Sequence, residues 1–401
     1  MSWNYSEAID RIGQGPLADR PAIIHEKISI NFGELRRRTR GIAAWLQTLP
    51  LKRHSHIGHY MRNSNAYLET FFGGGLAGCA HVNVNYRYQN RELEELCNTL
   101  DIEVLVYDAE FADRVAVIKP HLEKTIAFIE VTDTTPLNDF AIALSELYQY
   151  STESLEKNTA GDNQILIATG GTTGLPKGTQ WLQKDLWQKM NVCTNFGMQP
   201  VNTTPQTFDD YIDAIESLDA SPALFPMSPL MHGTGLMMAI SLLAQGSPVV
   251  TTGQAKYDPD HCLDLIMANK VGMIVIVGDA FSLPLLTAIE SRKDNCFASI
   301  AAVMSSGAIL SDESRARFKA QREAMVRGGA LAAAPAEPPW CAPATSSTNS
   351  RPHSPALCCL SRPPRASRWG AASKARSYAA VNTTIPSSRA KTAGRKPRRT
   401  A

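Results

Sequence analysis

The sequence predicts an α/β protein in which mostly parallel sheets are covered by helices. Helical and strand patterns alternate through residues 1–322, an order typical of parallel strands joined by helical connections. The length of 401 residues, with 44% hydrophobic and 19% charged side chains, is ordinary for a globular chain of two or more domains or subdomains. The remaining residues, 323–401, are predicted to form a disordered basic tail.

A first α/β subdomain region is predicted over residues 1–160. Its spacing of apolar residues indicates a hairpin over 22–32, then a helix, and short buried strands at 104–107 and 126–131. The apolar face of that helix comprises Leu35, Ile42, Ala43, Leu46 and Leu49. A polar stretch, 151–162, connects this region to the next.

A second α/β subdomain region is predicted over residues 161–322. It opens with a strand over 164–168 that runs straight into a glycine-rich turn. An aspartate in the N-cap position, followed by proline, predicts a helix over 258–270. Further strands are expected at 272–277 and 299–304, which continue the alternation of the first region.

The tail differs from the body in composition and in charge. From Ala324 onward there are 13 Lys and Arg residues against one acid, Glu337, whereas the upstream part holds 27 basic and 37 acidic residues. The tail holds ten of the 24 prolines but only six Leu, Ile, Val or Phe residues. It could not bury enough apolar surface to offset a chain entropy of about 1–2 kcal/mol per residue. Coding DNA read out of frame would produce such a stretch, and a natural basic linker or interaction tail stays the alternative.

The sequence also predicts a cytoplasmic protein. The first residues include Glu7 and Asp10 and lack the apolar segment of a signal peptide. The longest apolar run, 236–244, has about half the length that crosses a bilayer. The eight cysteines show no paired spacing, which suits a reducing compartment. No transmembrane segment is expected, and peripheral membrane contact is left open.

The strongest functional signal is the glycine-rich turn that ends the strand at 164–168. Its glycines allow left-handed backbone and leave amides unshielded, so that several amides can converge on phosphate oxygens. Its threonines add hydroxyl donors, and Lys177 supplies a positive charge for a polyphosphate. The turn is not a Walker A loop, because Gly178 stands where that motif has Ser or Thr. The predicted phosphate-binding residues are Thr169, Gly170, Gly171, Thr172, Thr173, Gly174, Lys177 and Gly178.

This turn resembles the phosphate-binding signature of the adenylate-forming (AMP-binding) enzymes, the superfamily of acyl-CoA synthetases, luciferases and peptide-synthetase adenylation domains. Blocks at 82–86, 229–235 and 305–308 agree with that family in order and spacing. The continuation at 177–185 is similar to the fatty acyl and steroid side-chain CoA ligases more than to the amino-acid activators. The resemblance covers about residues 1–322 and implies part of the N-terminal domain of the acyl-CoA synthetase-like fold.

The resemblance implies an AMP-dependent acyl-CoA synthetase of fatty acid or related lipid metabolism. In this family a carboxylate attacks the α-phosphate of Mg·ATP to form acyl-AMP and pyrophosphate, and CoA then displaces AMP. The implied substrates are a small-molecule carboxylate and a nucleotide, with CoA as co-substrate. His232 would sit beside the α-phosphate and the carboxylate as the catalytic residue. The implied acyl and adenine pocket consists of His232, Gly233, Ser306, Gly307 and Ala308.

The sequence departs from the family after Ala308. No aromatic-Gly-x-Thr-Glu motif occurs there, so the family's magnesium-binding glutamate has no counterpart. Its ribose-binding aspartate, its hinge and the C-terminal domain with the adenylation lysine have none either. The sequence therefore indicates a truncated and inactive acyl-CoA synthetase, and a non-catalytic remnant that binds ATP or acyl-adenylate stays the alternative. A nucleic-acid binder that uses the basic tail is the weakest hypothesis, because few aromatic residues interleave the cations; no specific nucleic acid is expected.

Three smaller patterns could suggest other sites. His54, His56 and His59 lie on a strand-like segment whose alternation sends His54 and His56 to one face and His59 to the other. The Cys358–Cys359 pair lacks zinc-ligand spacing, so no metal ligand is predicted. The glycines at 73–75 follow a helical stretch and have no lysine nearby, which favours a helix end or a close packing contact over a second phosphate loop.

Overall fold

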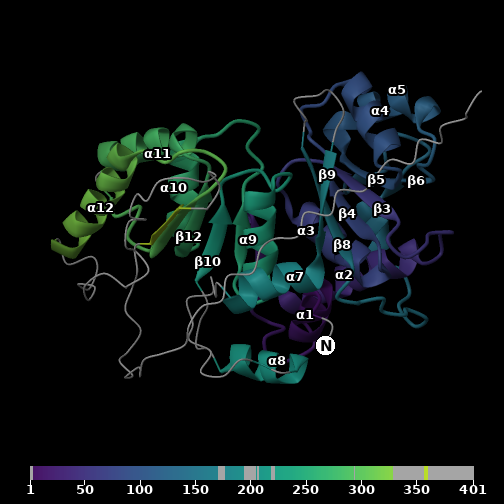
Figure 1. Cartoon of the computed structure of the whole chain (residues 1–401), viewed down its shortest axis with the longest axis horizontal. Helices are drawn as coiled ribbons and strands as arrows, with labels where there is room; N and C mark the ends of the chain where they lie inside the picture. Colours follow the sequence, from purple (N-terminus) through teal and green to yellow (C-terminus); the bar gives the residue numbers. More distant parts are fainter. Residues whose placement is uncertain are drawn as a thin grey trace, which may run out of the picture. The chain divides into compact units, whose positions relative to one another are not determined.

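Two seven-stranded sheets organise the computed structural model (Figure 1). The residues that the structure describes are 3–169, 177–193, 205, 207–217, 222–292, 294–327 and 356–359. All of them lie in one compact unit, Met1–Arg362, whereas the second unit, Pro363–Ala401, falls outside the described residues. Of the predicted tail, only the end of one helix and one short strand are described.

The first sheet has the strand order β14-β13-β12-β10-β11-β1-β2. Its strands are β1 (Pro21–His25), β2 (Ile28–Asn31), β10 (Ala223–Pro226), β11 (Val249–Thr251), β12 (Val271–Ile276), β13 (Ala302–Ser305) and β14 (Ala356–Cys359). The strands pair in parallel except at the two edges, where β1 pairs with β2 and β13 pairs with β14 in antiparallel fashion.

The second sheet has the strand order β7-β6-β5-β3-β4-β8-β9. Its strands are β3 (His56–Tyr60), β4 (Ala80–Asn83), β5 (Ile102–Asp108), β6 (Ala127–Val131), β7 (Ile142–Ala143), β8 (Gln164–Thr169) and β9 (Lys177–Leu182). The strands pair in parallel except for the β8–β9 hairpin. The prediction of mostly parallel sheets is thus confirmed.

Helices connect the strands, as crossovers between parallel neighbours require. They are α1 (Tyr5–Ile12), α2 (Phe32–Leu46), α3 (Asn65–Ala77), α4 (Asn90–Thr99), α5 (Ala112–Ile118), α6 (Leu144–Leu147), α7 (Gln183–Trp187), α8 (Phe208–Glu216), α9 (Gly233–Leu243), α10 (Pro259–Ala268), α11 (Asp279–Ser291) and α12 (Asp312–Arg327). Two 3-10 turns, Ala109–Phe111 and Lys119–His121, and a π-helical segment, Gln188–Cys193, complete the described elements.

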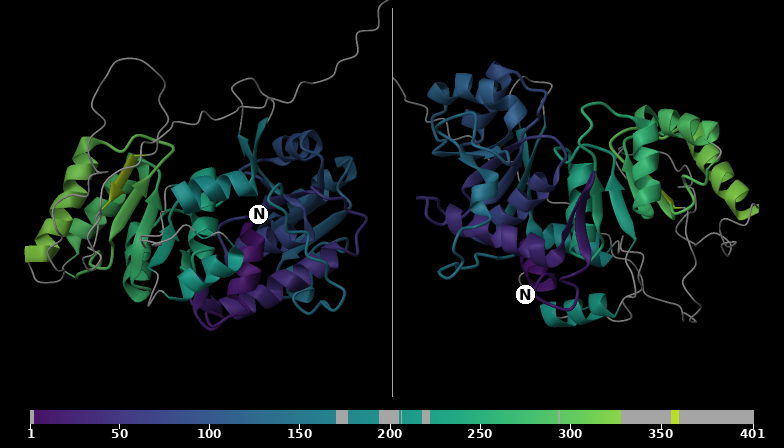
Figure 2. Two further views of the ribbon diagram at one scale, coloured as in Figure 1. Left: turned by 60° about the horizontal axis from the view of Figure 1, so that its bottom comes forward. Right: turned by 180° about the vertical axis from the view of Figure 1, so that it is seen from behind.

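The helices form three layers around the two sheets (Figure 2). Helices α1, α2, α3 and α9 share one apolar core with inward side chains of both sheets, for example Leu224 of β10 and Ile165 of β8. Helices α10, α11 and α12 cover the outer face of the first sheet, and α4 and α5 cover the outer face of the second. The interior strands are therefore buried on both faces, which is why strands such as β5 and β12 read as nearly continuous apolar runs.

The two sheets exchange strands across residue 160. Strands β1 and β2 come from the first predicted region but join β11 of the second, and β8 and β9 join β4 of the first. The division into 1–160, 161–322 and 323–401 follows the order of the sequence, whereas membership of a sheet follows packing. It stays a prediction about folding units.

Local signals in the sequence located several elements. The predicted helix at 258–270 is α10, and its N-cap Asp258 accepts hydrogen bonds from the backbone amides of Asp260 and His261 at 3.1 and 3.2 Å. The glycines at 73–75 lie inside α3, where a Cβ on Gly73 would stand 2.7 Å from Ile42 Cγ2. They serve close helix packing, one of the two readings that the sequence favoured.

Of the three histidines at 54–59, His56 and His59 lie on β3 in different surroundings, as alternation predicts, whereas His54 precedes the strand with a φ of +66°. His56 is half-buried, whereas His59 is buried and lies 4.4 Å, ring to ring, from the buried His81. Loss of hydration lowers the pKa of His59 to about 4. Within the described ranges, no three His, Cys, Asp or Glu side chains gather so as to hold a metal ion. None of the described helices is both long and apolar enough to cross a membrane.

Candidate functional site

The glycine-rich turn is flanked by a β-hairpin. Thr169 at the end of β8 is opposite Lys177 at the start of β9, and Ala168 is opposite Gly178. Strand β9 was not predicted from the sequence, because four of its six residues are polar or glycine and gave no strand signal. Five of the predicted phosphate-binding residues lie outside the described residues: Gly170, Gly171, Thr172, Thr173 and Gly174. Phosphate binding by this turn stays a prediction.

Asn83, at the end of β4, ties the hairpin to a second predicted motif. Its buried side-chain amide donates to the carbonyl oxygens of Ala168 at 3.2 Å and Met231 at 2.5 Å, and its side-chain oxygen accepts from the Ala168 amide at 2.5 Å. Ala168 precedes the glycine-rich turn, and Met231 precedes His232. The sequence identified the 82–86 block, but the bridging role of Asn83 emerges only from the fold.

His232 lies at the N-cap position of α9 with extended backbone. Its amide donates to the carbonyl oxygen of Pro229 at 3.0 Å, which closes a turn and leaves the imidazole exposed. Neighbouring protein atoms that reduce hydration, and next the charge of Arg87, lower the pKa of His232 below its usual 6.5. The ring is therefore mostly neutral at pH 7, when one nitrogen donates a hydrogen bond and the other accepts one.

The turn after β13 lies against the start of α9. Gly307 has a φ of +85°, a conformation that favours glycine, and a Cβ there would stand 3.8 Å from Thr234 Oγ1. A Cβ on Gly233 would stand 3.9 Å from Ile167 Cγ2 of β8. The amide of Ser306 donates to the carbonyl oxygen of Ile276, at the end of β12. The turn that holds Ser306, Gly307 and Ala308 therefore lies beside the turn that holds His232 and Gly233.

These groups meet at the carboxyl ends of parallel strands, the common place for ligands in α/β sheets. We call this place the strand-end rim and define it by Ala168, His232, Gly233 and 306–308. The fold thus brings the described members of the predicted site together, although they are separated by up to 140 positions in the chain. Their assignment to adenine, acyl group or catalysis stays a prediction.

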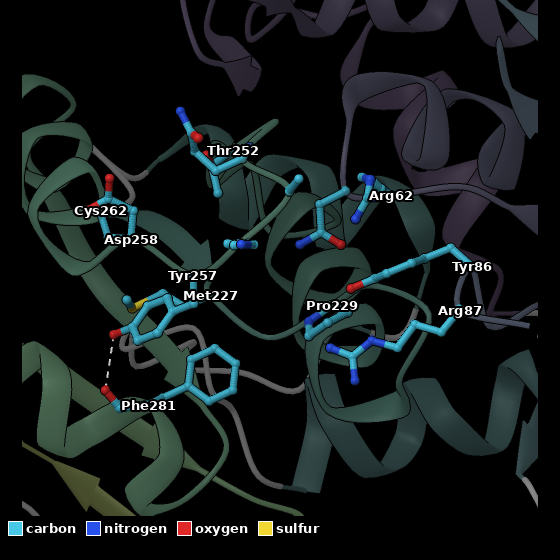
Figure 3. Close-up of a pocket in the computed structure, with 14 residues that line it drawn as sticks. Arg62, Tyr86, Arg87, Met227, Pro229, Thr252, Tyr257, Asp258, Cys262 and Phe281 are labelled. Atoms are coloured by element: carbon cyan, nitrogen blue, oxygen red, sulfur yellow. Dashed lines mark hydrogen bonds between the residues drawn. The ribbon is translucent and has the colours of Figure 1, made fainter. Parts of the chain in front are cut away.

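A pocket of about 310 Å³ adjoins the rim and was not found from the sequence (Figure 3). Arg62, Tyr86 and Arg87 lie on one side, and Tyr257 and Phe281 lie on the other. The residues that line it are Arg62, Asn63, Tyr86, Arg87, Met227, Pro229, Thr252, Gln254, Ala255, Lys256, Tyr257, Asp258, Cys262 and Phe281. They come from separate segments of the chain, so no contiguous motif marks the pocket.

The pocket combines positive charge with aromatic surface. The guanidinium carbon of Arg62 is 4.8 Å from the centre of the Tyr86 ring, and that of Arg87 is 5.9 Å from it. The Tyr257 hydroxyl donates to the carbonyl oxygen of Phe281 at 3.0 Å, which fixes the opposite wall. Arginine and lysine pair with phosphates and aromatic rings pack against planar groups, so the lining suits a ligand that has both.

A family model described as "AMP-binding enzyme" matches residues 11–331. The Mycolicibacterium smegmatis medium/long-chain-fatty-acid--CoA/3-oxocholest-4-en-26-oate--CoA ligase is 28% identical over 69% of this chain and 50% of its own length. The medium-chain acyl-CoA ligase Mig of Mycobacterium avium is 29% identical over 76% of this chain and 57% of its own length. The chain thus spans about half the length of the curated relatives it matches.

Solved structures show the same fold. The N-terminal domain of FACL13 from Mycobacterium tuberculosis matches with a TM-score of 0.63 and 16% identity, over 80% of this chain and 74% of that one. A long-chain-fatty-acid-CoA ligase, FadD1, from Archaeoglobus fulgidus matches with a TM-score of 0.65 and 16% identity, over 81% of this chain and 61% of that one. At such identities the likeness concerns the fold alone.

Proposed function

The chain belongs to the AMP-binding enzyme family, and we propose on this basis that its strand-end rim binds ATP and a carboxylic acid in the manner of an acyl-CoA ligase. The observation that carries the proposal is the convergence of the β8 end, the His232 turn and the Gly307 turn at one rim. The alternative, a protein that binds ATP or acyl-adenylate without turnover, uses the same rim. The curated relatives support a fatty acid or a steroid side-chain acid as the carboxylate.

Each group at the rim has a proposed task. The turn from Thr169 to Gly178 would hold the β- and γ-phosphates through its amides, with Lys177 offsetting their charge. His232, as a neutral ring, would donate a hydrogen bond to a carboxylate or phosphate oxygen. Gly307 and Ala308 lack bulk, which would let the backbone approach a flat adenine or an acyl group.

The described residues do not fit a magnesium site at this rim. Magnesium prefers carboxylate and other oxygen ligands. The described acids that follow Ala308 all lie on α12, where Asp312 pairs with Arg315 at 3.4 Å and Glu313 pairs with Arg317 at 3.6 Å. We propose that the 401-residue chain by itself binds substrates without completing acyl-CoA formation.

We further propose that the basic and aromatic pocket takes CoA, the second substrate of such a reaction. CoA carries phosphates and an adenine ring, which match Arg87 and Lys256 and the aromatic walls. The Arg62 guanidinium is already held by the Glu110 carboxylate, at 2.5 and 3.1 Å. Pro229 lines this pocket and also accepts the hydrogen bond that shapes the His232 turn. The pocket and the rim therefore share one turn.

Replacing Lys177 tests the phosphate-binding turn. Lys177→Ala is expected to weaken pyrophosphate and ATP binding by about 10- to 100-fold, because a charge-assisted hydrogen bond contributes about 1.5–3 kcal/mol. Isothermal titration calorimetry on both forms measures it. Lys184→Ala, which removes an exposed lysine seven positions further on, is the matched control and should bind like the wild type. Equal affinity of the Lys177 variant would mean that the turn is structural only.

Replacing Arg87 tests the pocket. Arg87→Ala is expected to weaken CoA binding about tenfold, because one phosphate loses its guanidinium partner. Arg53→Ala is the control, since Arg53 is a surface arginine paired with Asp162 and does not line the pocket. The affinity for 3′-dephospho-CoA, measured beside that for CoA, identifies which phosphate is held. An unchanged affinity in the Arg87 variant would exclude the pocket as the CoA site.

A further inference from the structure

One wall of the pocket is a loop that runs from the end of β11 to the start of α10. Thr252, Tyr257 and Asp258 of this loop line the pocket (Figure 3). We call residues 252–258 the wall loop. Its far end is anchored, because Asp258 caps α10 and the Tyr257 hydroxyl is bound to Phe281. Its near end leaves the sheet at Thr252 and needs a partner from elsewhere in the fold.

That partner is Glu26, in the turn between β1 and β2. Its carboxylate accepts hydrogen bonds from the Thr252 hydroxyl and the Gly253 amide, both at 2.8 Å. It also accepts from His261 Nε2 of α10, at 3.0 Å. Glu26 itself does not line the pocket. One carboxylate outside the pocket thus joins the near end of the wall loop to the helix that follows the loop.

The hairpin turn and the wall loop are also in close contact. His25 is paired with Thr251 in the parallel register of β1 and β11, and His25 Nδ1 lies 2.9 Å from Thr251 Oγ1. A Cβ on Gly253 would stand 3.4 Å from His25 Nε2, in van der Waals contact. The near end of the wall loop is therefore seated on the hairpin turn and is not only tethered to it.

The backbone of Glu26 does not suit its side chain. Its φ is +53°, in the left-handed region, where glycine or asparagine is favoured and a residue such as glutamate is strained. The turn alone would be better served by glycine. The hydrogen bonds that the carboxylate makes to Thr252, Gly253 and His261 account for a glutamate at this position.

We propose that Glu26 is a positioning residue that fastens the near end of the wall loop and thereby holds the pocket in its binding shape. The hydrogen bonds of Glu26 by themselves support the attachment of the loop, whatever ligand the pocket binds. Its consequence for affinity rests on the proposed function, in which the pocket takes CoA.

Glu26→Gly separates positioning from folding. Glycine relieves the backbone strain of the turn, which offsets the loss of the hydrogen bonds, so the variant should fold and melt close to the temperature of the wild type. The amides of residues 251–258 should nevertheless exchange with deuterium about tenfold faster, because the near end has lost its acceptor. CoA affinity should fall about five- to tenfold, since part of the binding energy must then order the loop.

Two further variants sharpen the test. Glu26→Gln keeps an oxygen acceptor for Thr252 and Gly253 but loses the charge, so its exchange and affinity should lie between those of the wild type and Glu26→Gly. Lys27→Gly changes the same turn without touching the carboxylate and should match the wild type in both measurements.

The outcomes are distinct. Faster exchange over 251–258 with weaker CoA binding in Glu26→Gly supports the proposal. Unchanged exchange overturns the fastening, and faster exchange with unchanged CoA affinity overturns the positioning role. If the wild-type chain binds no CoA at all, the pocket assignment of the proposed function fails, and the exchange measurement still decides whether Glu26 fastens the loop.

Discussion

The 401-residue chain is expected to release no pyrophosphate above background when it is given Mg·ATP, CoA and a medium- or long-chain fatty acid. After Ala308 the sequence has no counterpart of the family's magnesium-binding glutamate or ribose-binding aspartate. A carboxylate that accepts from two ribose hydroxyls makes two charge-assisted hydrogen bonds of about 1.5–3 kcal/mol each. Losing both corresponds to about 10²- to 10⁴-fold in nucleotide affinity. Preorganised charge on the reacting phosphate usually supplies the largest share of the rate enhancement, so chemistry should suffer more than binding.

The assay is carboxylate-dependent pyrophosphate release, with the Lys177→Ala variant as the baseline. ATP binding by calorimetry on the same preparation separates a folded, non-catalytic protein from an unfolded one. Turnover above the variant would contradict the proposal and would require catalytic groups outside those named here. ATP binding without pyrophosphate release is the result that the proposal expects.

Asn83→Ala is expected to lower the free energy of unfolding by about 2–4 kcal/mol and to weaken ATP binding. Asn83 is 3% exposed, and its side chain makes three hydrogen bonds to Ala168 and Met231. Buried backbone groups that lose a partner cost about 1–3 kcal/mol each, less where water replaces the amide. The same loss detaches the glycine-rich turn from the His232 turn, so binding should fall together with stability.

Urea unfolding and ATP calorimetry measure the two effects of Asn83→Ala. Asn98→Ala is the matched control, because the Asn98 side chain also donates to one backbone carbonyl and accepts from one amide, but near the surface at the end of α4. Asn98→Ala should lower the free energy of unfolding by less than about 1 kcal/mol, as the loss of such exposed contacts usually does. Equal losses in the two variants would mean that Asn83 does not link the two turns.

The sequence by itself determined the elements whose signals are local. The helix at Pro259–Ala268 was predicted because Asp258 satisfies free amides within one turn of itself. Buried parallel strands such as β5 and β12 were predicted because burial on both faces demands an apolar run. Strand β9 was not, since most of its residues are polar or glycine and its pairing with β8 depends on a hairpin.

Only the tertiary structure decided which distant segments meet. That β1 leaves the first region to pair with β11, that Asn83 joins Ala168 to Met231, and that Glu26 holds Thr252 are contacts between segments far apart in the chain. Periodicity and turn chemistry act over a few residues, whereas these contacts follow from how whole layers bury their apolar faces together. Each motif of the rim could therefore be predicted from the sequence, whereas their proximity and the adjoining pocket depend on tertiary packing.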